Sequence, residues 1–205
     1  MKLIENQFRS FEIEYVSFLQ FCKKEYFESM LGAFGHANEI RSKHSKSPIG
    51  ALLGRNHDYV KLGSASVYNF QNLQLNDLMF LNSKRIKILQ FVEIPKYLNR
   101  FIKLWMKGIS RRLEYLLVMS AIHVALSEDT VLKGVQKLEV GHQEKQKIWM
   151  ISNKFNSPEF QLTGAYTISS HDGRRATVVF KIGDGWSIVE LIVGDLLDDN
   201  EFRLR

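Results

Sequence analysis

The chain contains one cysteine and three prolines, and its runs of apolar residues are short. A single cysteine, Cys22, excludes an internal disulfide and favours a reducing compartment, so we expect an intracellular protein. The longest apolar run, residues 116–126, is too short to span a bilayer. Acidic residues among the first fourteen positions argue against a signal peptide. We therefore expect at most a peripheral position at the inner surface of a membrane.

Motifs that identify a reaction are also missing. The sequence has no phosphate-binding glycine loop, no Cys-x-x-Cys, no His-Glu-x-x-His and no Gly-x-Ser-x-Gly. A zinc site needs four ligands, which is demanding for a chain with one cysteine. The sequence therefore predicts a protein that is not an enzyme, with no catalytic residues, no metal and no cofactor.

What the chain has in excess is positive charge, concentrated in its middle. The net charge is +6, but residues 84–112 alone contain nine Lys or Arg and one acid. Residues 184–205 contain two bases and six acids, so the chain ends in an acidic tail. A segment with this excess of positive charge is suited to a polyanion.

The basic segment fits a helix from about 96 to 110, opened by Pro95 at a position that needs no amide hydrogen. At 100° per residue, five cations form one stripe, which we call the ridge: Lys96, Arg100, Lys103, Lys107 and Arg111. Five apolar residues lie opposite: Leu98, Phe101, Ile102, Trp105 and Ile109. Four flanking bases complete the predicted binding site: Lys84, Arg85, Lys87 and Arg112.

Two kinds of polyanion fit such a ridge. One is an anionic membrane surface together with a nucleoprotein, which indicates a structural or adaptor protein that self-associates as a homo-oligomer. The alternative is a nucleic-acid-binding protein that uses the same bases on phosphates.

Residue patterns divide the chain into three segments. Residues 1–35 form an N-terminal helical segment, with a helix over 11–34, and 36–66 read as a basic flexible loop or linker. Residues 67–205 form an α+β core domain with an acidic C-terminal tail. Within this domain, 115–126 is apolar on all sides and fits either a central strand or a buried helix.

The last third of the chain has the pattern of antiparallel strands. Residues 160–168, 177–182 and 186–193 are rich in alternating apolar residues, and Asp172-Gly173 supplies a tight turn. Two shorter strands are expected over 135–140 and 148–152. The predicted fold class is α+β: an antiparallel β-sheet core with a basic amphipathic helix packed on one face and an N-terminal helix.

The order of these elements resembles the core of rhabdovirus matrix proteins. The resemblance covers residues 84–193: a strand, the basic helix, a second strand and hairpins that include the stretch F-x-L-x-x-x-Y-x-I-S from Phe160. It implies a matrix protein, a membrane-associated structural component of a virion. A competing resemblance connects residues 160–172 with plant-virus cell-to-cell movement proteins, which implies binding of nucleic acid.

Overall fold

A computed structural model describes most of the chain. The described residues are 14–18, 23–34, 37–42, 56–63, 75–89, 94–121, 126–153, 160–183 and 185–194. The strands are β1 (Tyr15–Phe18), β2 (Glu39–Ser42), β3 (Tyr59–Leu62), β4 (Arg85–Leu89), β5 (Tyr115–Ala121), β6 (Leu138–Glu139), β7 (Gln161–Ser169), β8 (Arg175–Gly183) and β9 (Trp186–Val193). The helices are α2 (Lys24–Ala33), α3 (Leu75–Phe80), α4 (Ile94–Met106), α5 (Glu128–Val131) and α6 (His142–Asn153).

Nine strands of the described residues form one mixed sheet, in the order β1-β2-β3-β4-β5-β9-β8-β7-β6. Strands β1 to β5 are parallel to one another. The other half of the sheet is antiparallel: β5 pairs with β9, β9 with β8, β8 with β7, and β7 with β6. Parallel strands need a crossover between them, and α2, α3 and α4 lie in the connections between successive strands of the parallel half.

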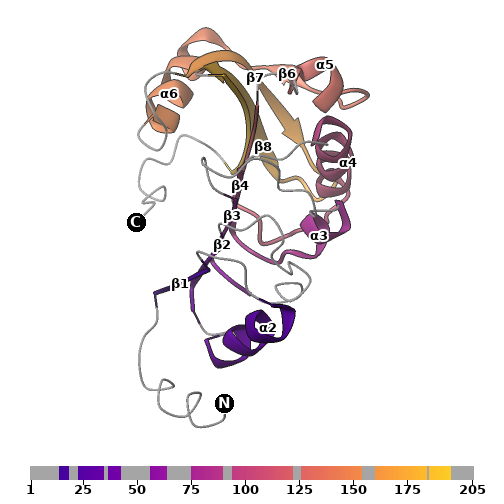
Figure 1. Ribbon diagram of the computed structural model, residues 1–205. Helices are drawn as coiled ribbons and strands as arrows, with labels where there is room; N and C mark the ends of the chain where they lie inside the picture. Colours follow the sequence, from indigo (N-terminus) through magenta and orange to yellow (C-terminus); the bar gives the residue numbers. More distant parts are fainter. Residues whose placement is uncertain are drawn as a thin grey trace.

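Helices cover both faces of the sheet (Figure 1). Helices α2, α3, α4 and α5 lie on one face, which we call the helical face, and α6 lies on the opposite face. The largest cluster of buried side chains sits between the sheet and the helical face, with members from all four of these helices. A smaller cluster joins Ile148 of α6 to Ala165, Val179 and Ile192 of the antiparallel strands.

The two central antiparallel strands are buried on both faces. Each strand contains six consecutive buried residues, 176–181 in β8 and 187–192 in β9. Such strands carry apolar residues on both sides, which is why their sequences show continuous apolar runs instead of strict alternation. The buried runs also include two charged residues, Lys181 and Glu190, which form an ion pair.

The predicted fold class, α+β with an antiparallel sheet core, is wrong. The sheet is mixed, its first five strands are parallel, and the described helices are few and short. The prediction failed because alternation of apolar residues identifies a strand but not its neighbour or its direction. Four-residue strands such as β2 and β3 are also too short to show a clear period.

The N-terminal predictions are corrected in two places. The region expected as one helix over 11–34 contains β1 and then α2, which begins at Lys24. The region expected as a loop over 36–66 contributes β2 and β3 to the sheet. The sheet therefore includes strands from all three predicted segments.

Further along the chain, one open question is answered and one strand is corrected. Residues 115–121 form β5, a strand, while 122–125 lie outside the described residues. The strand expected over 148–152 is instead part of α6. Among the described residues, no helix is long and apolar enough to cross a membrane.

Candidate binding surface

Local sequence signals set the start and the end of helix α4. Pro95 lies in its first turn, where a missing amide hydrogen costs no hydrogen bond. The helix ends four residues earlier than predicted, at Met106, because Gly108 takes a positive φ of 91°. This left-handed conformation suits glycine and terminates helices.

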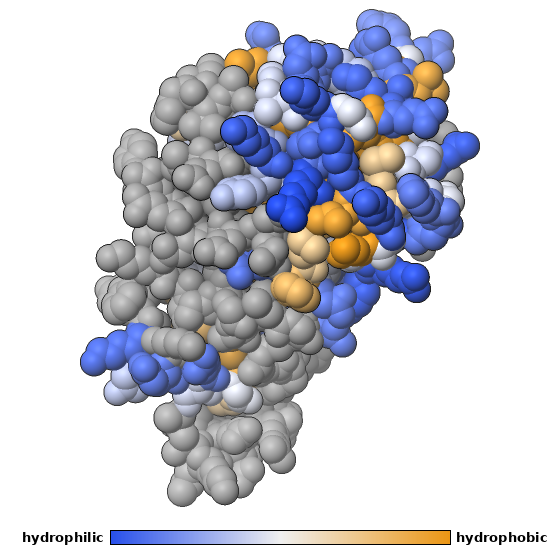
Figure 2. Space-filling model, turned by 90° about the vertical axis from the view of Figure 1, so that its right-hand side faces the viewer, coloured by the Kyte–Doolittle hydropathy of each residue, from blue (hydrophilic) through white to orange (hydrophobic). Residues whose placement is uncertain are grey.

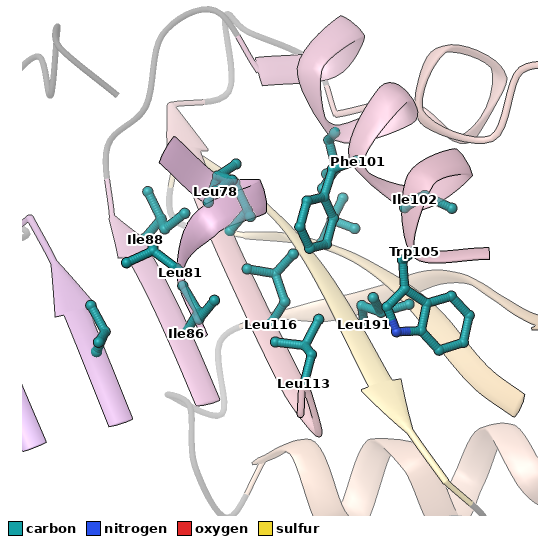
Figure 3. Close-up of a cluster of buried hydrophobic side chains, with 14 of the residues drawn as sticks. Leu78, Leu81, Ile86, Ile88, Phe101, Ile102, Trp105, Leu113, Leu116 and Leu191 are labelled. Atoms are coloured by element: carbon teal, nitrogen blue, oxygen red, sulfur yellow. The ribbon is translucent and has the colours of Figure 1, made fainter. Parts of the chain in front are cut away.

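The apolar side of α4 is buried against the sheet. Leu98, Phe101, Ile102 and Trp105 are each at most 1% exposed. Figure 3 shows Phe101, Ile102 and Trp105 pointing from α4 toward side chains of the strands below, including Leu116 and Leu191. The opposite side of the helix is therefore held in a fixed orientation toward solvent.

Three of the five ridge residues, Lys96, Arg100 and Lys103, lie on α4, while Lys107 and Arg111 follow its last residue, so the predicted stripe along one helix is wrong at its end. Lys96, Arg100, Lys107 and Arg111 are exposed and Lys103 is partly exposed. Figure 2, which views the helical face, shows hydrophilic side chains gathered over the upper part of the molecule around a smaller apolar patch. Within the part of the chain that the structure describes, none of the five ridge cations forms an ion pair with a carboxylate.

Helix α5 and the turn after it fix the first half of α4. The Asn99 side-chain amide donates hydrogen bonds to the carbonyl oxygens of Val131 at 2.8 Å and Lys133 at 3.0 Å. Lys103 Nζ lies 3.4 Å from the position of a Cβ atom at Gly134. The Lys103 side chain therefore lies against the turn that follows α5.

The hairpin between β7 and β8 holds the other end of α4. The backbone amide of His171 donates to the carbonyl oxygen of Met106 at 2.7 Å. Arg174 donates to the carbonyl oxygen of Arg111 at 3.0 Å, and its guanidinium lies 5.3 Å from the centre of the Trp105 ring. The Asp172-Gly173 turn predicts this hairpin, but nothing in the local sequence pattern indicates that Arg174 contacts a residue 63 positions away.

The same hairpin contains a carboxyl group with a low pKa. A hydrogen bond from the Ser170 hydroxyl, followed by hydrogen bonds from Arg174, lowers the pKa of Asp172 from 3.8 to about 2. Because the folded state favours the ionised carboxylate, this contribution to stability is present above pH 3.8 and is lost as the pH falls through 2.

We therefore expect Asp172→Asn to unfold with less acid dependence than the wild type between pH 4 and pH 2. Urea unfolding at a series of pH values measures this difference. Ser170→Ala removes the main hydrogen bond and raises the folded-state pKa of Asp172, so its acid-dependent loss of stability should be smaller and should end at a higher pH. Identical pH profiles for all three proteins would show that the carboxyl group makes no such contribution.

The four flanking bases of the predicted site do not join the ridge. Lys84 and Arg112 form ion pairs with Asp58, at 3.1 Å and 3.5 Å. Arg85 and Lys87 lie on β4, where they alternate with the buried Ile86 and Ile88 of the helical-face cluster. They therefore point to the opposite face of the sheet. The structure places Lys96, Arg100 and Lys103 on α4 and separates these four bases from them.

The structure shows no group of carboxylates, histidines or cysteines arranged for a metal. Among the described residues, no three such side chains lie close enough to hold an ion.

One family model matches this chain. Its description is "F-box associated", and it covers residues 49–118, which are 70 of the 205 residues, about a third. The matched stretch contains β3, α3, β4, α4 and the first part of β5, so it includes the whole ridge. No curated protein matches the chain. No solved structure matches it either.

This match corrects the resemblances drawn from the sequence. It is to an F-box-associated family, so the likeness to rhabdovirus matrix proteins and to plant-virus movement proteins is wrong. The expectation that the chain is a viral matrix protein or a virion component is wrong for the same reason. The resemblance rested on the order of strands and helices, and unrelated folds can share such an order.

Proposed function

We propose that this chain is a non-enzymatic adaptor domain that binds an acidic surface of a partner protein through the ridge. The observation that carries the proposal is the ridge itself: Lys96, Arg100 and Lys103 on a helix fixed to the sheet, and Lys107 and Arg111 after its end, all without an ion pair among the described residues. A rigid charged surface suits recognition because little conformational entropy is lost when it binds.

The family match supports a protein as the partner. A description such as "F-box associated" refers to a domain that accompanies another, which suits an adaptor. Complementary charge gives such an interface its specificity and speeds association. Self-association through the acidic tail stays a prediction, since residues 195–205 lie outside the described residues.

The test reverses two charges of the ridge. Lys103→Glu/Lys107→Glu should weaken binding to polyglutamate by about tenfold or more at low salt, because attraction becomes repulsion. Fluorescence anisotropy across a salt series measures it. Lys23→Glu/Lys147→Glu makes the same change in net charge at exposed positions outside the ridge and serves as the control.

Two further probes separate the proposal from its alternatives. A single-stranded oligonucleotide and vesicles rich in phosphatidylserine are compared with polyglutamate at matched ionic strength. Tighter binding to the oligonucleotide, with a log–log salt slope near −3.5 for five phosphates, would indicate a nucleic-acid-binding protein. Preference for the vesicles would indicate a membrane surface. Equal binding of polyglutamate by both charge-reversal variants would contradict a role for the ridge.

A further inference from the structure

A second group of cations lies on the face of the sheet opposite the ridge. Lys61 on β3 stands directly beside Lys87 on β4, and Arg85 occupies the same face two residues before Lys87. Neighbouring strands lie about 4.8 Å apart, so these three side chains leave the sheet from one small area. We call them the cationic triad.

The carboxylates on this face are engaged by other residues. Glu39 on β2 accepts two hydrogen bonds from Arg41, at 2.6 Å and 2.9 Å. Glu190 on β9 is paired with Lys181 at 3.2 Å and accepts a hydrogen bond from the Tyr115 hydroxyl at 3.1 Å. In the described ranges, no carboxylate forms an ion pair with any member of the cationic triad.

The triad is partly buried, so water does not fully solvate its charges. Burial and then the neighbouring charge of Lys61 lower the pKa of Lys87, while the charge of Glu190 opposes this change. The Nε atom of Arg85 is buried and has no hydrogen-bond acceptor among the described residues. Like charges placed directly opposite each other in a sheet are destabilising, and a buried donor needs an acceptor. Both costs are relieved by one bound anion.

We propose that the cationic triad binds a phosphate monoester carried by a side chain of a protein partner. A phosphate monoester has close to two negative charges and three acceptor oxygens at pH 7, which match two lysines and one arginine better than a single carboxylate does. Tyr59 stands beside Arg85 in register, and burial raises its pKa to about 12. Its hydroxyl therefore stays protonated and can donate to the same phosphate.

This site is separate from the function proposed above. The ridge lies on the helical face and the triad on the other, so each can be removed without changing the other. A phosphorylated group at the triad would let the partner's phosphorylation state control binding, which the ridge alone would not detect.

The experiment compares a phosphoserine tripeptide with its unphosphorylated form, each titrated into the full chain by calorimetry. We expect saturable binding of the phosphorylated tripeptide only, weakened at least tenfold in Lys61→Gln and in Lys87→Gln. Lys147→Gln on α6 and the ridge variant Lys103→Glu/Lys107→Glu should bind as the wild type does. Inorganic phosphate should bind the same residues more weakly than the tripeptide.

Thermal unfolding in chloride shows whether the variants are folded. Removing one of two adjacent like charges should leave the melting temperature unchanged or raise it, while adding phosphate should raise it in the wild type only. Equal affinity for both tripeptides, or unchanged affinity in both glutamine variants, would overturn the proposal. Inorganic phosphate binding as tightly as the tripeptide, or preference for phosphatidate vesicles, would overturn the assignment to a protein side chain.

Discussion

Lys181→Met is expected to lower the free energy of unfolding by about 3–5 kcal/mol, because it removes the ion-pair partner of the buried Glu190 carboxylate. The two side chains meet inside the sheet, with Lys181 Nζ 3.2 Å from one carboxylate oxygen and both side chains 0% exposed. Burial lowers the pKa of Lys181, and Glu190 opposes that change by favouring the charged form. Urea unfolding followed by circular dichroism measures the loss.

The double variant Lys181→Met/Glu190→Leu shows whether the loss of stability comes from leaving one buried charge without its partner. Replacing both partners removes two desolvated charges, so most of the lost stability should return. Lys145→Met is the matched control, since Lys145 pairs with Glu139 at the surface, and its effect should be much smaller. A loss under 1 kcal/mol for Lys181→Met would show that the pair is not buried as the structure has it.

Trp105→Ala is expected to cost about 3–5 kcal/mol, because it empties the largest fully buried side-chain volume in the core. Trp105 is 0% exposed, joins α4 to the sheet and lies under the guanidinium of Arg174. Its loss should also release the ridge from its fixed orientation. Thermal unfolding and polyglutamate binding, measured on the same variant, report the two effects.

Trp149 provides the control for this prediction. It lies on α6 and is 45% exposed, so Trp149→Ala should change stability by no more than about 0.5 kcal/mol. Trp105→Phe, which keeps a ring in the core, should fall between the two. Equal effects of Trp105→Ala and Trp149→Ala would contradict the packing of α4 against the sheet.

The sequence revealed features that repeat over a short distance. Helical spacing selected Leu98, Phe101, Ile102 and Trp105, which are buried on α4, but it also selected Ile109, Lys107 and Arg111, which lie beyond the end of the helix. The strand at 186–193 was predicted with the bounds that the structure has, because its apolar run and the turn before it are local signals.

Contacts between residues far apart in the chain could not be predicted from the sequence in the same way. Lys61 and Lys87 are 26 positions apart, yet parallel pairing of β3 and β4 places them side by side. Arg174 and Arg111 are 63 positions apart and joined by one hydrogen bond. The register of paired strands and the crossover connections between them decide such contacts, and neither produces a periodic pattern in the sequence.

The sequence by itself determined where positive charge is concentrated and which residues of α4 turn inward, because both depend on the spacing of neighbouring residues. The tertiary structure decided that the nine bases of residues 84–112 lie in three separate places. Five form the ridge, Lys84 and Arg112 pair with Asp58, and Arg85 and Lys87 join Lys61 across the sheet. The physical reason is that successive side chains of a strand point to opposite faces, while one side of a helix faces one direction.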